Sequence, residues 1–447
     1  MHVLAFKNFL QSKTVIASLV LVLLTGAVSI IIGQQFLAKK EKAIEAIHEF
    51  QHDHIGRNIK YFSTDMGLLM YYLRFALINK PDKLAAISVG QRDVNPAMQA
   101  VNIRGLEAQK YDTDLNNPAT LASGNLDLGF VIIYLFPLLI ISFTFNLLSE
   151  EKEAGTWSLV AVQSGSSLKF LLHKLAVRAV VVYALLAILL AAAAIVLAIP
   201  VNAQFAGICI ISVLYIAFWF VLGLLVSSLN KSSAFNALLF VALWVTLTIL
   251  LPASVNNYVA NKYPVPEALS TIVKQRDGYH MKWDTDKQQT MTKFYAHYPQ
   301  FATYRLPEKS FSWLWYYAMQ QLGDDEAASD AARMKAKLNQ RDKASNLAAV
   351  FIPTMHTQLQ LNAIAGTGMA NHLQFLDSTS SFHEKLRLKF YPAIFEASPA
   401  PAGDLKKIRP EYFSTATQVQ WPKALLPLLL PTGLLFGIGI FKLRKVV

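Results

Sequence analysis

The chain has 447 residues, of which 54% are hydrophobic and only 16% are charged. Soluble proteins of this length usually carry more charge, so the composition favours a membrane protein. The formal net charge of +12 comes without a dense basic run, which argues against a nucleic-acid partner. The single cysteine, Cys209, excludes an intrachain disulfide and a metal cluster built on thiolates.

Six apolar segments are long enough to cross a hydrocarbon core, which needs roughly 20 residues per helix. An amphipathic stretch at 1–13 precedes the first of them. The first is too long for a signal peptide and lacks a cleavage site, so we expect a retained helix. Pro137 predicts a kink in the second segment. The predicted spans are residues 14–36, 128–148, 179–199, 205–229, 235–252 and 424–441.

Basic residues gather in the short loops on one side of these spans and in the tail 442–447. The positive-inside rule therefore places both termini in the cytoplasm of the cell. Two long polar segments, 37–127 and 253–423, are then expected outside the cytoplasm. Apolar residues from Ile44 to Leu73 recur at helical steps, which predicts a long amphipathic helix continuing out of the first span. The predicted class is an all-α polytopic membrane protein with six transmembrane helices and two large, mainly helical extracytoplasmic inserts.

The loop 149–178 follows the second span. It begins with an acidic cluster, continues with E-K-E-x-G-T, and ends with basic residues that return the chain to the membrane. One interpretation is a solvated loop that obeys the positive-inside rule. The other is a docking element for a cytoplasmic partner. The candidate contact residues are Glu150, Glu151, Glu153, Gly155, Thr156 and Trp157.

E-K-E-x-G-T after the second of six spans resembles the type-2 ABC-transporter permease family. The stretches 85–96 (AAISVGQRDVNP) and 363–375 (AIAGTGMANHLQF) are similar to a bacterial branch of that family, whose long extracytoplasmic inserts include a domain of unknown function. The resemblance implies that 149–178 is a coupling helix on an ATP-binding subunit, and that 1–13 is an elbow helix along the inner membrane surface. It also implies a second permease chain, identical or paralogous.

No G-x-x-x-x-G-K-[ST] phosphate loop occurs in the sequence, so this chain is not expected to be the ATPase. By the resemblance, ATP and Mg would be bound by the partner subunit, and this chain would hold no cofactor. The spans carry no charge in their cores, so no ion pathway, cargo or direction of transport is indicated.

The string HEFQH matches H-E-x-x-H, the zinc-protease signature, with His48 and His52 on one helical face. The extended signature would need a glycine and a third histidine where the chain has Ile55 and Asn58. The pattern therefore favours a solvated helix face with no metal. A weak metal site that adds His54, and a membrane metalloprotease, are the remaining alternatives.

The last span contains G-x-x-x-G at Gly433 and Gly437, a spacing that lets two helices approach closely. A dimer contact and packing within the chain are equally compatible with it. The leading functional hypothesis is a permease subunit in the bacterial inner membrane that couples ATP hydrolysis by a separate ATPase to substrate movement. The alternative is a subunit that transmits ATP-driven motion to another envelope protein without transport.

Overall fold

The computed structural model of the chain is mostly helical. It describes residues 2–111, 125–163, 166–307, 311–400, 402–414 and 418–446. Parts of the predicted first insert (112–124) and of the predicted coupling segment (164–165) lie outside the described residues. Six described helices are long and apolar enough to cross a membrane, which confirms the number predicted from the sequence.

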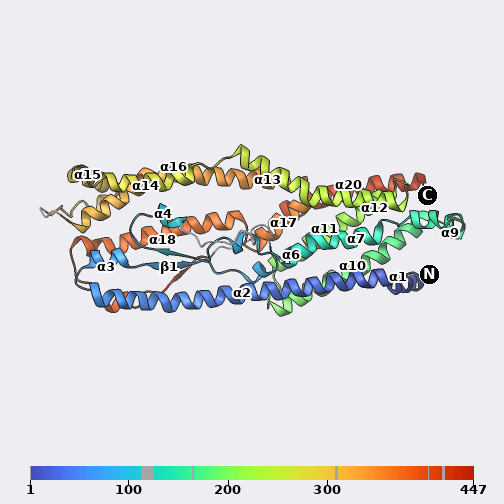
Figure 1. Cartoon of the computed structure of the whole chain (residues 1–447), viewed down its shortest axis with the longest axis horizontal. Helices are drawn as coiled ribbons and strands as arrows, with labels where there is room; N and C mark the ends of the chain where they lie inside the picture. The colour runs from blue at the N-terminus through green and yellow to red at the C-terminus, as the bar shows by residue number, and fades with distance from the viewer. Residues whose placement is uncertain are drawn as a thin grey trace.

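The six spans and their connections form the end of the molecule at which both chain termini lie (Figure 1). We call this part the bundle. Its elements in chain order are α1 (His2–Gln11), α2 (Lys13–Phe62), α6 (Leu128–Phe130), η3 (Val131–Leu135), α7 (Phe136–Thr144), α8 (Ser149–Glu153), α9 (Trp157–Gln163), α10 (Ser167–Val196), α11 (Ala203–Ser227), α12 (Ser233–Val245), η4 (Thr246–Leu250), α13 (Leu251–Lys262) and α20 (Trp421–Val446).

The remaining elements extend to the opposite end of the molecule (Figure 1), and we call them the distal region. They are α3 (Met66–Tyr72), β1 (Phe75–Ile78), η1 (Lys83–Ala86), η2 (Gly90–Asp93), β2 (Met98–Val101), α4 (Glu107–Lys110), α14 (Glu267–Met281), α15 (Lys287–His297), η5 (Pro299–Phe301), α16 (Trp313–Ala349), α17 (Pro353–Ile364), α18 (Met369–Phe395), α19 (Ala402–Leu405) and β3 (Glu411–Tyr412).

Helix α2 is a 50-residue helix that carries the first span and then runs along the distal region (Figure 1). Its distal half buries Ile44, Ile55 and Ile59, as the predicted apolar stripe requires. The prediction of one helix up to Leu73 was wrong, because α2 ends at Phe62. The side chain of Asp65 then accepts a hydrogen bond from the backbone N–H of Leu68 at 3.0 Å and starts α3 as a separate helix.

The second and fifth spans each contain a π-helical turn, η3 and η4, directly before a proline near the start of the next α-helix. Proline lacks the N–H that would complete the helix, so nearby carbonyl groups lose their partners. Other helices supply donors: Tyr215 Oη bonds the carbonyl of Ile133 at 2.8 Å, and Thr354 Oγ1 bonds that of Leu247. The bend expected at Pro137 is therefore a π-helical turn held by neighbouring helices.

Several helix ends differ from the predicted boundaries. Helix α10 begins at Ser167, well before the predicted start of the third span, because the Ser166 side chain caps it by accepting from the N–H of Lys169. Helix α13 continues the fifth span as far as Lys262, and α20 remains helical through most of the predicted tail. Charged residues lie on these extensions, so hydropathy alone does not mark where the helices end.

The distal region contains a small sheet that the sequence did not predict. Strand β1 pairs antiparallel with β2 and parallel with β3, in the order β2-β1-β3. Because β3 comes from the second predicted insert, the two segments share one sheet. The expectation of mainly helical structure is therefore wrong for residues 75–101, where strands and short 3-10 turns replace helix.

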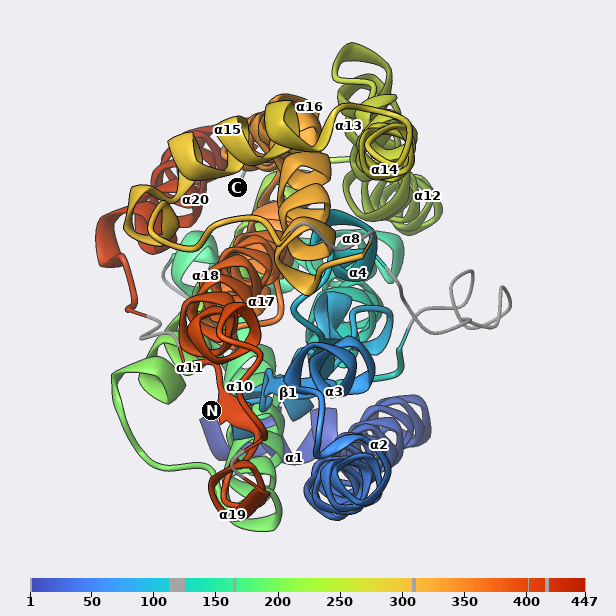
Figure 2. The ribbon, with the colours of Figure 1, turned by 90° about the vertical axis from the view of Figure 1, so that its left-hand side faces the viewer.

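One core of buried residues joins both polar segments of the distal region, and it is rich in aromatic side chains. Helix α18 lies between α16 on one side and β1 with α2 on the other (Figures 1 and 2). Arg387 of α18 is buried and donates to the carbonyls of Ile103 (3.1 Å) and Arg104 (2.8 Å) and to the Asp324 carboxylate of α16 (2.9 Å). This group of hydrogen bonds fastens the loop after β2 to both helices.

Helix α17 inserts into the distal end of the bundle, although the sequence assigned it to an insert. It packs against α11, α20 and η4. Besides the bond from Thr354 to η4, the His356 ring pairs its Nε2 with the carbonyl of Ala424 in α20 at 2.9 Å. The distal region is therefore joined to the fourth, fifth and sixth spans by a buried wedge.

Candidate functional site

The candidate partner-docking segment consists of α8 and α9, and it lies at the end of the molecule where both termini lie (Figure 1). Helix α8 ends in a turn at Gly155, whose φ of +71° is one that side chains with a Cβ rarely adopt. The N–H of Gly155 bonds the carbonyl of Lys152 (3.2 Å), and that of Thr156 bonds the carbonyl of Glu151 (3.0 Å). This glycine C-cap turns the chain sharply between two short helices.

Two of the predicted acidic contacts face back toward the chain's own third span. Lys174 of α10 donates to Glu150 at 2.9 Å and to Glu151 at 3.0 Å. Arg178 lies 3.9 Å from Glu150 and 5.8 Å from the ring of Phe9 in α1. The ion pairs fix α8 against α10, and Arg178 in turn contacts the N-terminal helix through Phe9.

The third acidic residue, Glu153, is tied to the fifth span. It accepts from the N–H of Ser233 at 2.7 Å and from the Ser233 hydroxyl at 2.8 Å, at the positive N-terminal end of α12. Beside it, Lys152 donates to Asn230 at 2.6 Å. All three carboxylates therefore have partners within the chain, and α8 connects the second, third and fifth spans.

Trp157 also faces inward. Its ring is half-buried against a small apolar cluster that includes Leu147, Leu171 and Leu443, and Lys152 lies 5.5 Å from the ring centroid. The Thr156 hydroxyl donates to Glu151 at 2.8 Å. Of the six residues predicted to contact a partner, four are exposed: Glu150, Glu153, Gly155 and Thr156.

The exposed apolar surface of the segment comes from two residues that the sequence interpretation did not select. Leu159 and Val162 lie three residues apart in α9 and are 58% and 84% exposed. Residues at this spacing share one helix face. A branched apolar pair in a short helix outside the predicted spans was the signal that could have identified them. The segment therefore presents the apolar face of α9 next to α8, which ion pairs hold in place.

In the structure, His48, His52 and His54 each have different surroundings. His48 pairs with the Tyr412 hydroxyl at 2.7 Å, and His54 with the carbonyl of Tyr72 at 3.2 Å. His52 is exposed and lines a surface groove on α2 together with Glu49 and other charged residues. In the part of the chain that the structure describes, no three side chains of His, Cys, Asp or Glu are grouped as a metal site would require.

The two distal stretches that carry the family resemblance lie side by side. The N–H of Gln91 bonds the carbonyl of Thr367 at 2.9 Å, and the Thr367 hydroxyl bonds the carbonyl of Ser88 at 2.9 Å. Arg92 is buried, and its Nη2 donates to Asn371 at 3.3 Å. Burial lowers the pKa of Arg92 to about 10, which leaves it charged at neutral pH. These contacts join η2 to the turn between α17 and α18 and to the start of α18.

Comparison with known families gives one match. Residues 268–413 are similar to a family described as Domain of unknown function (DUF3526). No curated protein and no solved structure matches the chain. The match begins in α14 and ends directly after β3, so it covers most of the distal region but none of the six spans. The core of the matched segment also needs α3, β1 and β2, which come from the other polar segment.

Proposed function

We propose that this chain is the membrane-spanning permease subunit of a bacterial ABC transporter of the type-2 class, with its termini and α8–α9 in the cytoplasm. A separate ATP-binding subunit would bind ATP and Mg and receive α9 in a groove. A second permease chain would complete the assembly in the inner membrane. The observation that carries the proposal is the exposed Leu159–Val162 face, set on a base that is hydrogen-bonded or ion-paired to two other spans.

The geometry of α8–α9 supports a coupling role. A docking element transmits force only if it is rigid with respect to the helices that must move. The Lys174 pairs connect it to α10, and the Glu153 cap connects it to α12. Displacement of α9 by a partner would therefore act on the third and fifth spans together.

The first test removes the apolar face without adding charge. Leu159→Ser combined with Val162→Ser should weaken binding of a co-expressed ATP-binding subunit by about 3 kcal/mol, roughly a hundredfold, if both side chains are buried in the complex. Co-purification from membranes and ATP turnover are the measurements. Full retention of the ATPase and of its turnover would leave α8–α9 as a connector and remove the structural support for this function.

The second test uses a matched pair at the turn. Gly155→Val cannot adopt the positive φ easily and should displace α9, whereas Gly155→Asn tolerates that backbone and should keep the ATPase. Among the residues that the structure describes, no atom lies within 4 Å of a Cβ placed at this position, so crowding by them does not confound the comparison. Equal behaviour of the two variants would contradict a role for the turn.

Orientation has its own test. In a chain with Cys209→Ser, a cysteine at the exposed position Lys406 should react with an impermeant maleimide in intact spheroplasts, and one at Val162 should not. The reverse labelling pattern would place α9 outside the cell and overturn the proposed ATPase contact.

A second candidate function is supported by helix continuity. Helix α2 runs from the bundle into the distal region without a break, α13 packs against α16 of the distal region, and α17 is bonded to two spans. These connections would transmit ATP-driven motion from the bundle through the distal region to another envelope protein. ATP turnover in proteoliposomes without movement of lipid or peptide would favour this alternative. Lys42→Pro interrupts α2 at an exposed position and should then abolish the ATP-driven motion of the distal region. Lys42→Ala should preserve that motion.

A further inference from the structure

Helix α20 leaves one of its faces without a partner. Its packing against the rest of the bundle uses buried residues that include Ala424, Leu428 and Leu443. The glycines of the G-x-x-x-G sequence face elsewhere: within the described part of the chain, no atom lies within 4 Å of a Cβ placed at Gly433 or Gly437. Intrachain packing therefore does not explain why these positions are glycine.

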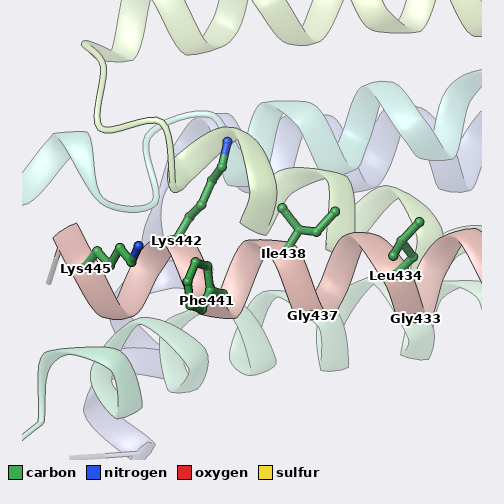
Figure 3. A pocket seen from close by; sticks show the side chains of 7 residues that line it. All are labelled: Gly433, Leu434, Gly437, Ile438, Phe441, Lys442 and Lys445. Atoms are coloured by element: carbon green, nitrogen blue, oxygen red, sulfur yellow. The ribbon is translucent and has the colours of Figure 1, made fainter.

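The open face is a shallow groove with one polar end, and every residue that lines it belongs to α20. Figure 3 shows Leu434, Ile438 and Lys442 pointing to one side of the helix. At the end nearest the C-terminus, the amino group of Lys445 lies 4.3 Å from the ring centroid of Phe441. Neither lysine forms an ion pair with a residue that the structure describes.

The dimensions of the groove correspond to one leaflet of a bilayer. From the first glycine to the last lysine the helix rises by about 18 Å, at roughly 1.5 Å per residue. Half of a hydrocarbon core is about 15 Å. An acyl chain that lies against Gly433 and Gly437 would therefore reach the membrane surface at the position of Lys442 and Lys445.

We propose that this groove, from Gly433 to Lys445, binds an anionic phospholipid. One acyl chain would occupy the space over Gly433 and Gly437, beside Leu434 and Ile438, and the headgroup phosphate would lie between Lys442 and Lys445. Two cations that form no ion pair with a described residue, at one end of an apolar groove, complement an amphiphile with a single anionic head. The inference is independent of the proposed ATPase contact.

Charge argues against a second copy of α20 as the occupant. Two copies in one membrane share the same orientation, so a symmetric G-x-x-x-G contact would bring Lys442 and Lys445 of both helices to the same end. The two like-charged pairs would repel each other, whereas a phosphate would neutralise them.

The first experiment measures lipid bound to the purified full chain. Reconstitution into phosphatidylcholine vesicles containing phosphatidylglycerol, followed by native mass spectrometry, should detect retained phosphatidylglycerol. Lys442→Gln with Lys445→Gln should lower its affinity by roughly 25-fold, about fivefold per lysine. Lys423→Gln, an exposed lysine at the other end of the same helix, is the control and should change nothing. Equal retention in all three proteins would overturn the proposal.

The second experiment distinguishes lipid from protein as the occupant. Gly437→Leu fills the floor of the groove at a position where a Cβ meets no described atom within 4 Å, and should reduce phosphatidylglycerol retention while both lysines remain. In a Cys209→Ser background, Leu434→Cys should not form a disulfide with a second copy in membranes. Efficient crosslinking at this position, together with lipid retention unaffected by Gly437→Leu, would assign the groove to a chain-to-chain contact.

Discussion

The bundle and the distal region are held together by different interactions. The buried core of the bundle is mainly aliphatic, and backbone carbonyls near Pro137 and Pro252 accept hydrogen bonds from side chains of α11 and of the inserted α17. The core of the distal region is richer in aromatic side chains and encloses a buried arginine bonded to a carboxylate and two carbonyls. Inside a bilayer, no water can satisfy an exposed backbone group, so donors must come from neighbouring helices. Outside it, a charged side chain can be desolvated only if its hydrogen bonds are replaced.

The largest expected effect tests the buried charge of the distal region. Arg387→Met leaves Asp324 buried without its cation and should lower the unfolding free energy of the distal region by about 3–5 kcal/mol. Lys385→Met on the same helix breaks only the exposed pair with Glu411 and should cost about 0–1 kcal/mol. Thermal unfolding followed by intrinsic fluorescence compares the two. Similar small losses in both variants would contradict the role assigned to Arg387.

The next effect depends on pH. Burial, followed by the charge of Arg387, lowers the pKa of His383 well below its usual 6.5, although the ring bonds the carbonyl of Arg104 at 2.6 Å. The fold therefore favours the neutral form of His383. The contribution of this preference to the free energy of unfolding is complete above about pH 6.5 and is lost as the pH falls below that value. The loss should be up to about 1.4 kcal/mol per pH unit.

His383→Gln keeps a donor and removes the titration, so its melting temperature should depend less on pH between 6.5 and 5 than that of the unmodified chain. His280→Gln, at an exposed position of α14, is the control. If both variants retain the full dependence on pH, other groups cause it.

The smallest effect tests the bundle. Tyr215→Phe removes the donor to the Ile133 carbonyl in the π-helical turn before Pro137, and should cost about 1 kcal/mol. The hydroxyl of Tyr183 instead bonds Val213 at 3.2 Å in uninterrupted helix, so Tyr183→Phe should cost less. Unfolding of the detergent-solubilised chain ranks the two. The reverse order would show that the π-helical turn does not depend on this bond.

Much of the bundle could be predicted from the sequence, but less of the distal region could. Span number follows from hydropathy because each membrane helix must satisfy its own backbone within a fixed thickness. The sheet was missed because β3 has two residues and its partner β1 lies far away in the chain. In the docking segment, the turn at Gly155 could be predicted from a local preference, whereas the inward position of Trp157 depends on residues of α10, α11 and α20.

The sequence by itself determined the six apolar helices, the stripe that extends α2, and the glycine turn between α8 and α9. These features depend on neighbours within a few residues, and their periodicity and composition record them directly. Tertiary structure alone decided that the three glutamates pair within the chain, that Leu159 and Val162 form the exposed face, and that the G-x-x-x-G face of α20 is open. Each of those outcomes depends on which distant helix occupies the adjacent space, and no local pattern specifies that neighbour.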